Sequence, residues 1–337
     1  MIKRSAALAV LLLASCSPAP APRDRLYVSL EHGDAVAVID PASRTVVQRL
    51  TPGKRPRGMM LSPDHAKLYV AVSGSPIGGP GVDEDKLPPA DHRADGIAVV
   101  DLSSGKVERV LAAGSDPETF AMSPDGRTLF VSNEDTGSVS AVAVDGGRAT
   151  QTSRVGDEPE GVAVTSDGAR LFVACEASNL VAMLDARTLQ PMKTIPIAGR
   201  PRTLLASRDG ATIFAAVETA GQLAFISSVD GKLLGLLDLA KGDKSIRPMG
   251  MVEGPDGHLF VATGRAGSVI EVDPARRAIV RTISGVGARP WGVALTQDQR
   301  LLVTANGPSD DVTFVDRTTG KLLGKVGAKG SPWGFAR

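Results

Sequence analysis

Short apolar segments of three to six residues recur along the chain, and polar or turn-forming residues separate them. Examples are Ile97–Asp101, Leu129–Val131 and Val312–Asp316. Their content of Val, Ile, Leu and Phe is typical of short β-strands. Asp-Gly pairs follow several such segments, at positions 125–126, 167–168, 209–210 and 256–257. Because Gly adopts a positive φ at no steric cost, each pair indicates a tight hairpin. The pattern therefore predicts an all-β protein of antiparallel strands.

The pattern repeats with a period of 42 residues, and a proline opens one apolar segment in each unit. The seven prolines are Pro56, Pro117, Pro159, Pro201, Pro248, Pro290 and Pro332. Four of the six intervals are 42 residues long, and the other two carry insertions of 19 and 5 residues. Each unit holds four predicted strands. Seven four-stranded units of this length predict a seven-bladed β-propeller.

The two ends of the repeat region indicate how the ring closes. The first predicted strand, Leu26–Val28, matches the second strand of a unit, whereas the last, Pro332–Ala336, matches a first strand. We expect the C-terminal strand to pair with the N-terminal strands, which removes an open sheet edge. The propeller then spans residues 25–337. Residues 74–94 are a Gly- and Pro-rich inserted loop, and we consider a lid, a docking arm or an irregular insertion without a role.

Three motifs carry a resemblance to a known family. RPRGMMLSPD (55–64), LYVAVSG (68–74) and DGIAVVDLSSGKV (95–107) resemble the YVTN-type β-propeller repeat family over residues 25–337. The ordered triplets RPR, DPE, EPE, RPR, RPM, RPW and SPW are similar to periplasmic propellers associated with PQQ-dependent alcohol catabolism. This second resemblance implies an accessory or binding protein that works alongside a quinoprotein dehydrogenase.

The N-terminus has the features of a processing segment. Lys3 and Arg4 precede a short apolar run, and Leu13-Ala-Ser-Cys16 resembles a bacterial lipobox. We expect residues 1–15 to be a signal peptide, Cys16 to be lipidated, and residues 16–24 to form a proline-rich tether. Ser17 resembles the sorting signal of outer-membrane lipoproteins, so the expected location is the periplasm, anchored to a bacterial membrane by this lipid alone. An ordinary secretory signal with a chance cysteine is the alternative.

Composition narrows the classes of function. The net charge is +1, and no basic block suggests a nucleic-acid binder. No phosphate-binding loop, Ser-His-Asp elbow or CxxCH haem motif is present. Cys175 is the only cysteine besides Cys16 and lies in an apolar run, so we expect a buried residue and no intramolecular disulfide. We expect a monomer, and not the dehydrogenase itself.

The candidate site lies at the mouth of the central channel. Strand direction places the proline triplets and the ends of the second strands on one face of the ring. The residues after the prolines and after the second strands converge there. The resulting candidate ligand-binding residues are Arg57, Glu118, Glu134, Glu160, Glu176, Arg202, Glu218, Trp291 and Trp333.

Three interpretations of these residues stay open. Arginine forks at 55, 57, 200, 202, 247 and 289, beside tryptophan faces, suit a flat polycarboxylate such as PQQ. Glu118, Glu134, Glu160 and Glu176 suit Ca²⁺, as in a metal-dependent lactonase-like hydrolase. Alternatively, the pairs Arg57–Glu118 and Glu160–Arg202 only join neighbouring blades of a protein-interaction scaffold. We favour a binding protein over an enzyme and assign no catalytic residue.

Overall fold

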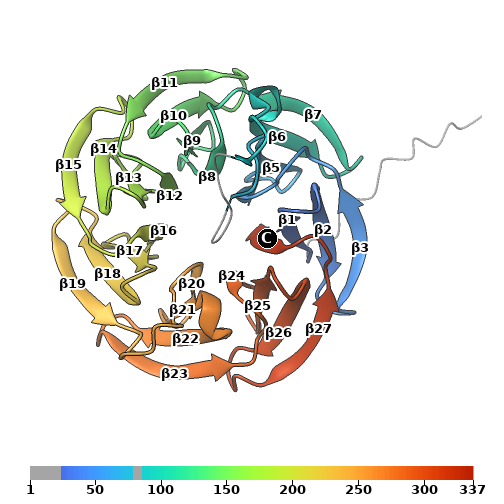
Figure 1. Ribbon diagram of the computed structural model, residues 1–337, viewed down its shortest axis with the longest axis vertical. Coiled ribbons are helices and arrows are strands. Elements are labelled where there is room, and N and C mark those ends of the chain that lie inside the picture. The colour runs from blue at the N-terminus through green and yellow to red at the C-terminus, as the bar shows by residue number, and fades with distance from the viewer. Residues whose placement is uncertain (1–23, 79–85, 337) are drawn as a thin grey trace, which may run out of the picture.

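The computed structural model describes residues 24–78 and 86–336. Within these residues, seven four-stranded antiparallel sheets form a ring around a central channel (Figure 1). The expectation of an all-β, seven-bladed propeller is thereby confirmed. The signal peptide, Cys16 and most of the tether lie outside the described residues, as does the centre of the inserted loop. No helix in the described ranges is long and apolar enough to cross a membrane.

Each blade runs from an innermost strand at the channel to an outermost strand at the rim. The innermost strands are β4 (Met59–Leu61), β8 (Pro117–Met122), β12 (Pro159–Val164), β16 (Pro201–Ala206), β20 (Met251–Glu253), β24 (Pro290–Leu295) and β28 (Pro332–Ala336). The second strands are β1 (Leu26–Leu30), β5 (Lys67–Val72), β9 (Thr128–Asn133), β13 (Arg170–Cys175), β17 (Thr212–Val217), β21 (Leu259–Ala262) and β25 (Leu301–Asn306).

The outer half of each blade follows the same order. The third strands are β2 (Ala35–Asp40), β6 (Gly96–Asp101), β10 (Ser138–Ala143), β14 (Leu180–Asp185), β18 (Gln222–Ser227), β22 (Ser268–Asp273) and β26 (Asp311–Asp316). The outermost strands are β3 (Thr45–Leu50), β7 (Lys106–Leu111), β11 (Ala149–Arg154), β15 (Pro191–Pro196), β19 (Leu233–Asp238), β23 (Ala278–Ser284) and β27 (Leu322–Gly327). Two short 3₁₀ helices, η2 (His92–Ala94) and η3 (Gly264–Ala266), occur in the described loops.

The ring closes through the pairing of the two ends of the chain, as expected. β28 pairs antiparallel with β1, with Tyr27 opposite Ala336 and Val28 opposite Phe335. β1, β2 and β3 complete the same sheet. The inner edge of β1 is therefore paired.

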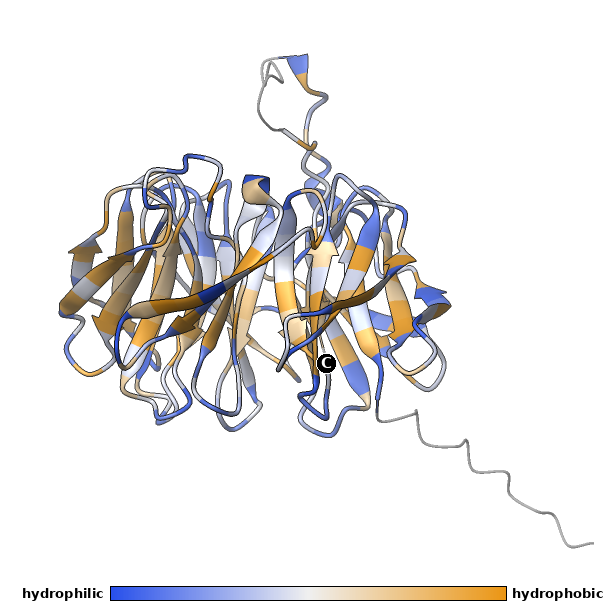
Figure 2. Ribbon diagram, turned by 90° about the horizontal axis from the view of Figure 1, so that it is seen from below, coloured by the Kyte–Doolittle hydropathy of each residue, from blue (hydrophilic) through white to orange (hydrophobic). Residues whose placement is uncertain are grey.

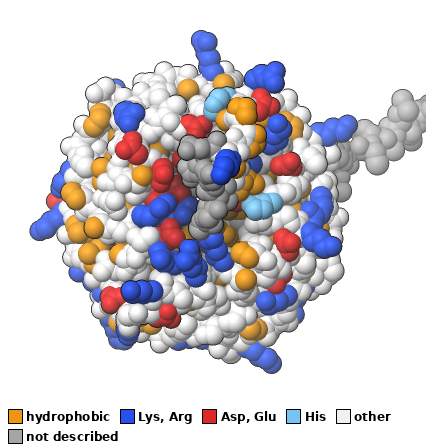
Figure 3. Space-filling view, in the orientation of Figure 1, with side chains coloured by type: hydrophobic (Ala, Val, Ile, Leu, Met, Phe, Trp, Pro, Cys, Tyr) orange, Lys and Arg blue, Asp and Glu red, His pale blue; other side chains and the backbone are white. Residues whose placement is uncertain are grey.

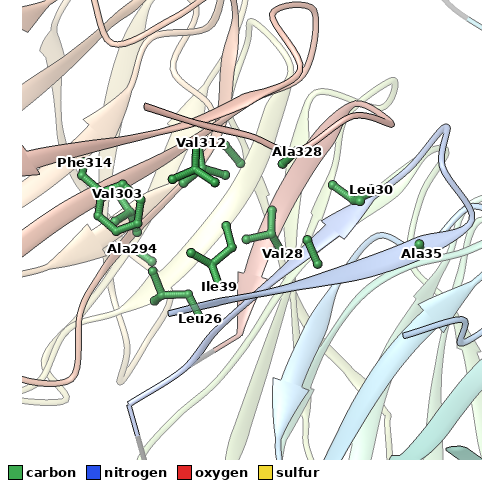
Figure 4. Close-up of a cluster of buried hydrophobic side chains, with 13 residues drawn as sticks. Leu26, Val28, Leu30, Ala35, Ile39, Ala294, Val303, Val312, Phe314 and Ala328 are labelled. Atoms are coloured by element: carbon green, nitrogen blue, oxygen red, sulfur yellow. The ribbon is translucent and has the colours of Figure 1, made fainter. Parts of the chain in front are cut away.

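The hydrophobic core lies between the faces of neighbouring blades. In one cluster, Leu26, Val28 and Ile39 of the closing blade pack on Val303 and Phe314 of the preceding blade (Figure 4). Second and third strands are almost entirely buried, whereas outermost strands are mostly exposed. Figure 2 shows apolar residues along the strands and more polar residues in the loops at both faces of the ring. The blades are thus joined mainly by apolar packing.

Small residues let neighbouring innermost strands approach one another around the channel. The residue two positions after each proline is Gly in five blades and Thr in the other two. The Gly250 N–H donates to the Trp291 carbonyl of the next blade at 2.8 Å, and a Cβ at Gly250 would meet that oxygen at 2.6 Å. In a threonine blade, the Thr119 hydroxyl donates to the Glu160 carbonyl at 2.5 Å. These bonds hold the proline triplets of successive blades in register at the mouth.

Candidate functional site

A cavity of about 1180 Å³ opens where the proline triplets and the ends of the second strands meet. Figure 3 shows acidic and basic side chains gathered side by side next to the centre of this face. Eight of the nine residues expected at the mouth line the cavity, and they are Glu118, Glu134, Glu160, Glu176, Arg202, Glu218, Trp291 and Trp333. Arg57, the ninth, does not line it.

The residue before the proline takes a left-handed backbone in six of the seven triplets. These residues are Arg55, Asp116, Glu158, Arg200, Arg289 and Ser331, with φ between 43° and 63°. Left-handed φ is uncommon for residues with a side chain, so the neighbouring structure must hold it. At several of these positions, a side-chain oxygen of the preceding blade accepts the backbone N–H of the left-handed residue and so holds the turn. Asn179 Oδ1 accepts the Arg200 N–H at 3.0 Å, and Asp310 Oδ1 accepts the Ser331 N–H at 2.8 Å.

This arrangement has a signal in the sequence that the motif analysis missed. The residues whose side-chain oxygens accept these hydrogen bonds each lie 21 residues before the triplet residue that they hold, and they are Asp34, Asp95, Asn179 and Asp310. An Asp or Asn at this spacing therefore marks a triplet that is fixed by the preceding blade. In the triplets that Asp34 and Asn179 hold, the residue after the proline, Arg57 or Arg202, pairs with a glutamate across the blade interface.

Arg57 is fully buried, and both terminal nitrogens of its guanidinium are bound by other residues of the protein. Its guanidinium forms ion pairs with Asp116 and Glu118 of the next blade and lies 3.4 Å from Glu134 Oε2. It also donates to the Pro117 carbonyl at 3.0 Å. Arg57 therefore holds the carboxylates of the mouth in place, which differs from the expectation that it offers a fork to a ligand.

Arg202 forms a second centre of this kind three blades further around the ring, and it binds carboxylates of the preceding blade and of its own blade. Its Nε lies 2.7 Å from Glu160 Oε2 and 3.2 Å from Glu176 Oε2, and its Nη1 lies 3.2 Å from Glu218 Oε2. Arg200 forms a further ion pair with Glu176. The inter-blade pairs Arg57–Glu118 and Glu160–Arg202, one of the three interpretations of the sequence, are thus present in the structure.

Carboxyl groups crowd the half of the mouth around Arg57 and Arg202, and burial raises the pKa of two of them. Burial and the neighbouring Glu118 raise the pKa of Glu134 to about 10, although Arg57 opposes the shift. Burial also raises the pKa of Glu160 to about 7 against the charge of Arg202. Glu134 is therefore neutral at pH 7, and Glu160 titrates near it.

The predicted cation ligands do not converge on one point. Among the described residues, the one group of three whose ligand atoms all lie within 4.8 Å is His92, Asp95 and Asp135, at the edge of the mouth. The four glutamates expected to bind Ca²⁺ form no such group there. All four lie against arginines instead, Glu118 and Glu134 against Arg57, and Glu160 and Glu176 against Arg202. The geometry therefore gives the calcium interpretation no preassembled site.

The other half of the mouth is basic and aromatic. The Arg289 guanidinium carbon lies 4.4 Å from the centre of the Trp291 ring, and that of Arg202 lies at 5.2 Å. Arg247 and Arg265 line the same cavity. Within the described ranges, neither of these two nor Arg289 forms an ion pair with a carboxylate. Arg265 is not among the residues expected from the sequence, because it belongs to the irregular turn η3 rather than to a proline triplet.

Comparison with known proteins places the chain among propellers. No protein-family model matches it. Antigen Lp49 of Leptospira interrogans is 29% identical over 140 residues, which cover 33% of this chain and 31% of that protein. The chain thus matches about a third of the length of this curated relative.

Solved structures match over nearly the whole chain. The periplasmic gluconolactonase PpgL of Pseudomonas aeruginosa has a TM-score of 0.74 and 22% identity, covering 93% of this chain and 98% of that one. Hydrazine synthase of Kuenenia stuttgartiensis has a TM-score of 0.73 and 19% identity, covering 87% and 92%. These likenesses concern the fold alone. The protein is a seven-bladed β-propeller whose fold resembles that of lactonase-like proteins.

Proposed function

We propose that this protein binds a small, flat, anionic ligand at the channel mouth and supports PQQ-dependent alcohol oxidation as an accessory protein. The observation that carries the proposal is the set of arginines without carboxylate partners in the described part of the mouth. Arg289 stacks on Trp291, and Arg247 and Arg265 line the same cavity. Guanidinium groups bind carboxylates through two parallel hydrogen bonds, and an indole face stacks on a flat ring. PQQ combines carboxylates with a flat ring system and is the first ligand to test.

The accessory role rests on the proline triplets, which resemble those of PQQ-associated propellers. In this proposal Cys16 carries lipid and holds the propeller in the periplasm, at the outer membrane. The protein acts there as a monomer beside a quinoprotein dehydrogenase, and no catalytic residue is assigned.

A lactonase-like hydrolase is the alternative, and its support is the fold shared with the gluconolactonase of Pseudomonas aeruginosa. The arrangement of charges at the mouth supports a hydrolase less well than it supports an anion-binding protein. A cation at the glutamates would have to displace Arg57 or Arg202 from carboxylates that these arginines already bind. Removing a partner from a buried ion pair is costly, so such a site would assemble only at the expense of the blade interface.

Calorimetric titration with PQQ and, separately, with Ca²⁺ tests both proposals. Micromolar PQQ binding that is lost in Arg289→Gln and retained in Arg276→Gln supports the first, because Arg276 is exposed in the turn between β22 and β23. Ca²⁺ binding that is lost in Glu160→Gln, together with lactone turnover, supports the second. Binding of neither ligand would contradict both and leave a protein-interaction scaffold.

A further inference from the structure

The ring encloses a second cavity, of about 460 Å³, farther along the innermost strands. This channel cavity shares Glu160, Arg202, Trp291 and Trp333 with the mouth cavity. The two spaces therefore adjoin at the level of the tryptophans. Its volume lies within the range of about 300 to 1000 Å³ that small-molecule sites occupy.

The wall of the channel cavity is mainly apolar. Six different blades contribute Met60, Phe120, Leu205, Met251, Val293 and Phe335. Met59 and Met249 also line it. Methionine is flexible and polarisable, so a wall rich in methionine adapts to apolar ligands of different shape.

Polar groups in the wall of the channel cavity already form hydrogen bonds with neighbouring blades. The Gly58 N–H donates to the Glu118 carbonyl at 3.0 Å, and the Gly250 N–H donates to the Trp291 carbonyl at 2.8 Å. The Thr119 hydroxyl donates to the Glu160 carbonyl at 2.5 Å. An apolar group that enters the channel would therefore not deprive these groups of hydrogen bonds, which is the usual cost of burying polar atoms.

The charge above the channel complements this apolar wall. Arg289 lies over Trp291, which belongs to both cavities, and Arg247 lines the mouth. A ligand that spans both spaces would place an anionic group among the arginines and an apolar group among the methionines. We propose that the channel cavity binds the alkyl chain of an amphipathic carboxylate whose head group lies against Arg289 and Trp291. This inference rests on the anion site of the proposed function and adds a second class of ligand to that site.

A series of unbranched carboxylates of increasing length tests the inference. The chain contains two tryptophans, and both line the junction of the cavities, so intrinsic fluorescence reports on this place. We expect the dissociation constant to fall roughly three- to fourfold for each added methylene between butanoate and decanoate, because burial of a methylene contributes about 0.8 kcal/mol. The full-length protein is titrated by fluorescence and by calorimetry.

Two channel variants and one surface variant locate the alkyl chain. Leu205→Gln and Met60→Gln place an amide in the channel wall and are expected to flatten the dependence on chain length. Met192→Gln alters a 54% exposed side chain on the outermost strand β15 and is expected to leave the dependence unchanged. Thermal unfolding of each variant shows whether it is folded.

The outcomes separate this inference from the proposed function. Dissociation constants that are independent of chain length, with PQQ binding intact, would overturn the inference and leave the proposed function standing. A chain-length dependence that persists in both channel variants would also overturn it, because the alkyl chain would then lie elsewhere. Failure of PQQ and of every carboxylate to bind would overturn both proposals together.

Discussion

Arg202 Nε lies 2.7 Å from Glu160 Oε2 across the interface between two blades. Arg57 and Glu118 form the equivalent pair at another interface. Carboxylates and arginines that the sequence offers as ligand groups are therefore largely bound to one another. The arginines without such partners in the described structure lie on the tryptophan side, which is why the binding proposal rests on that half of the mouth.

The first prediction concerns the buried pair of Arg57. Arg57→Met leaves Asp116 and Glu118 buried without their counter-charge, so we expect the free energy of unfolding to fall by about 3 to 5 kcal/mol. Urea denaturation measures the change. The control is Arg276→Met, whose exposed pair with Asp273 is expected to contribute about 1 kcal/mol or less. A loss for Arg57→Met as small as that of the control would show that the buried pairs do not stabilise the ring.

The second prediction concerns the close approach of the innermost strands. A Cβ at Gly250 would meet the Trp291 carbonyl oxygen at 2.6 Å, whereas a Cβ at the equivalent Gly334 would meet nothing closer than 3.6 Å. We expect Gly250→Ala to destabilise the protein by about 1 to 3 kcal/mol, the usual range for overpacking. Gly334→Ala is the matched control and should be close to neutral in thermal unfolding. Equal effects at the two positions would mean that strand approach does not set the requirement for glycine.

The third prediction concerns pH. Because the pKa of Glu134 is raised to about 10 from an ordinary value of 4.5, the folded protein keeps a proton that the unfolded chain releases between these pH values. The unfolded state then binds fewer protons, so stability falls as pH rises through this window. Glu134→Gln should therefore gain stability over the natural protein between pH 5 and pH 9. Urea midpoints across that range test this, with Glu158→Gln, at a half-buried glutamate, as control. Parallel pH profiles for the natural protein and Glu134→Gln would show that the pKa of Glu134 is not raised in the folded protein.

The fourth prediction concerns the N-terminus. If Cys16 is lipidated, the protein made in a bacterial host incorporates labelled fatty acid and sediments with the membranes. Cys16→Ser should abolish the label and the sedimentation, whereas Cys175→Ala, at the other cysteine, should keep both. Absence of label from the unaltered protein would exclude a lipoprotein.

The fold could be predicted from the sequence because a propeller repeats one local pattern seven times. The spacing of Pro117, Pro159 and Pro201 sets the blade length, and strand direction assigns each loop to a face. Arg57 could not be placed in the same way. Its position next to a proline puts it at the mouth, but periodicity does not tell whether the side chain enters the channel or the blade interface. The carboxylates of the next blade, Asp116 and Glu118, decide that.

The remaining site residues give a second reason why the sequence repeat does not predict the whole site. Arg265 lies in η3, outside the triplets, and only the folded chain brings it to the mouth beside Arg247. Four of the six left-handed turns before the prolines depend on oxygens from another blade, 21 residues earlier. Both features depend on contacts between blades, which a pattern within one blade does not contain.

Fluorescence titration with PQQ tests the central claim most directly, because Trp291 and Trp333 are the only tryptophans in the sequence and both line the mouth. We expect saturable quenching with a micromolar dissociation constant. Arg289→Gln should weaken binding by roughly tenfold or more, as expected for loss of a charged hydrogen-bond donor worth about 1.5 to 3 kcal/mol. Arg276→Gln should bind as the natural protein does. Equal affinity in all three proteins, or no quenching in any of them, would contradict an anion site on the tryptophan side of the mouth.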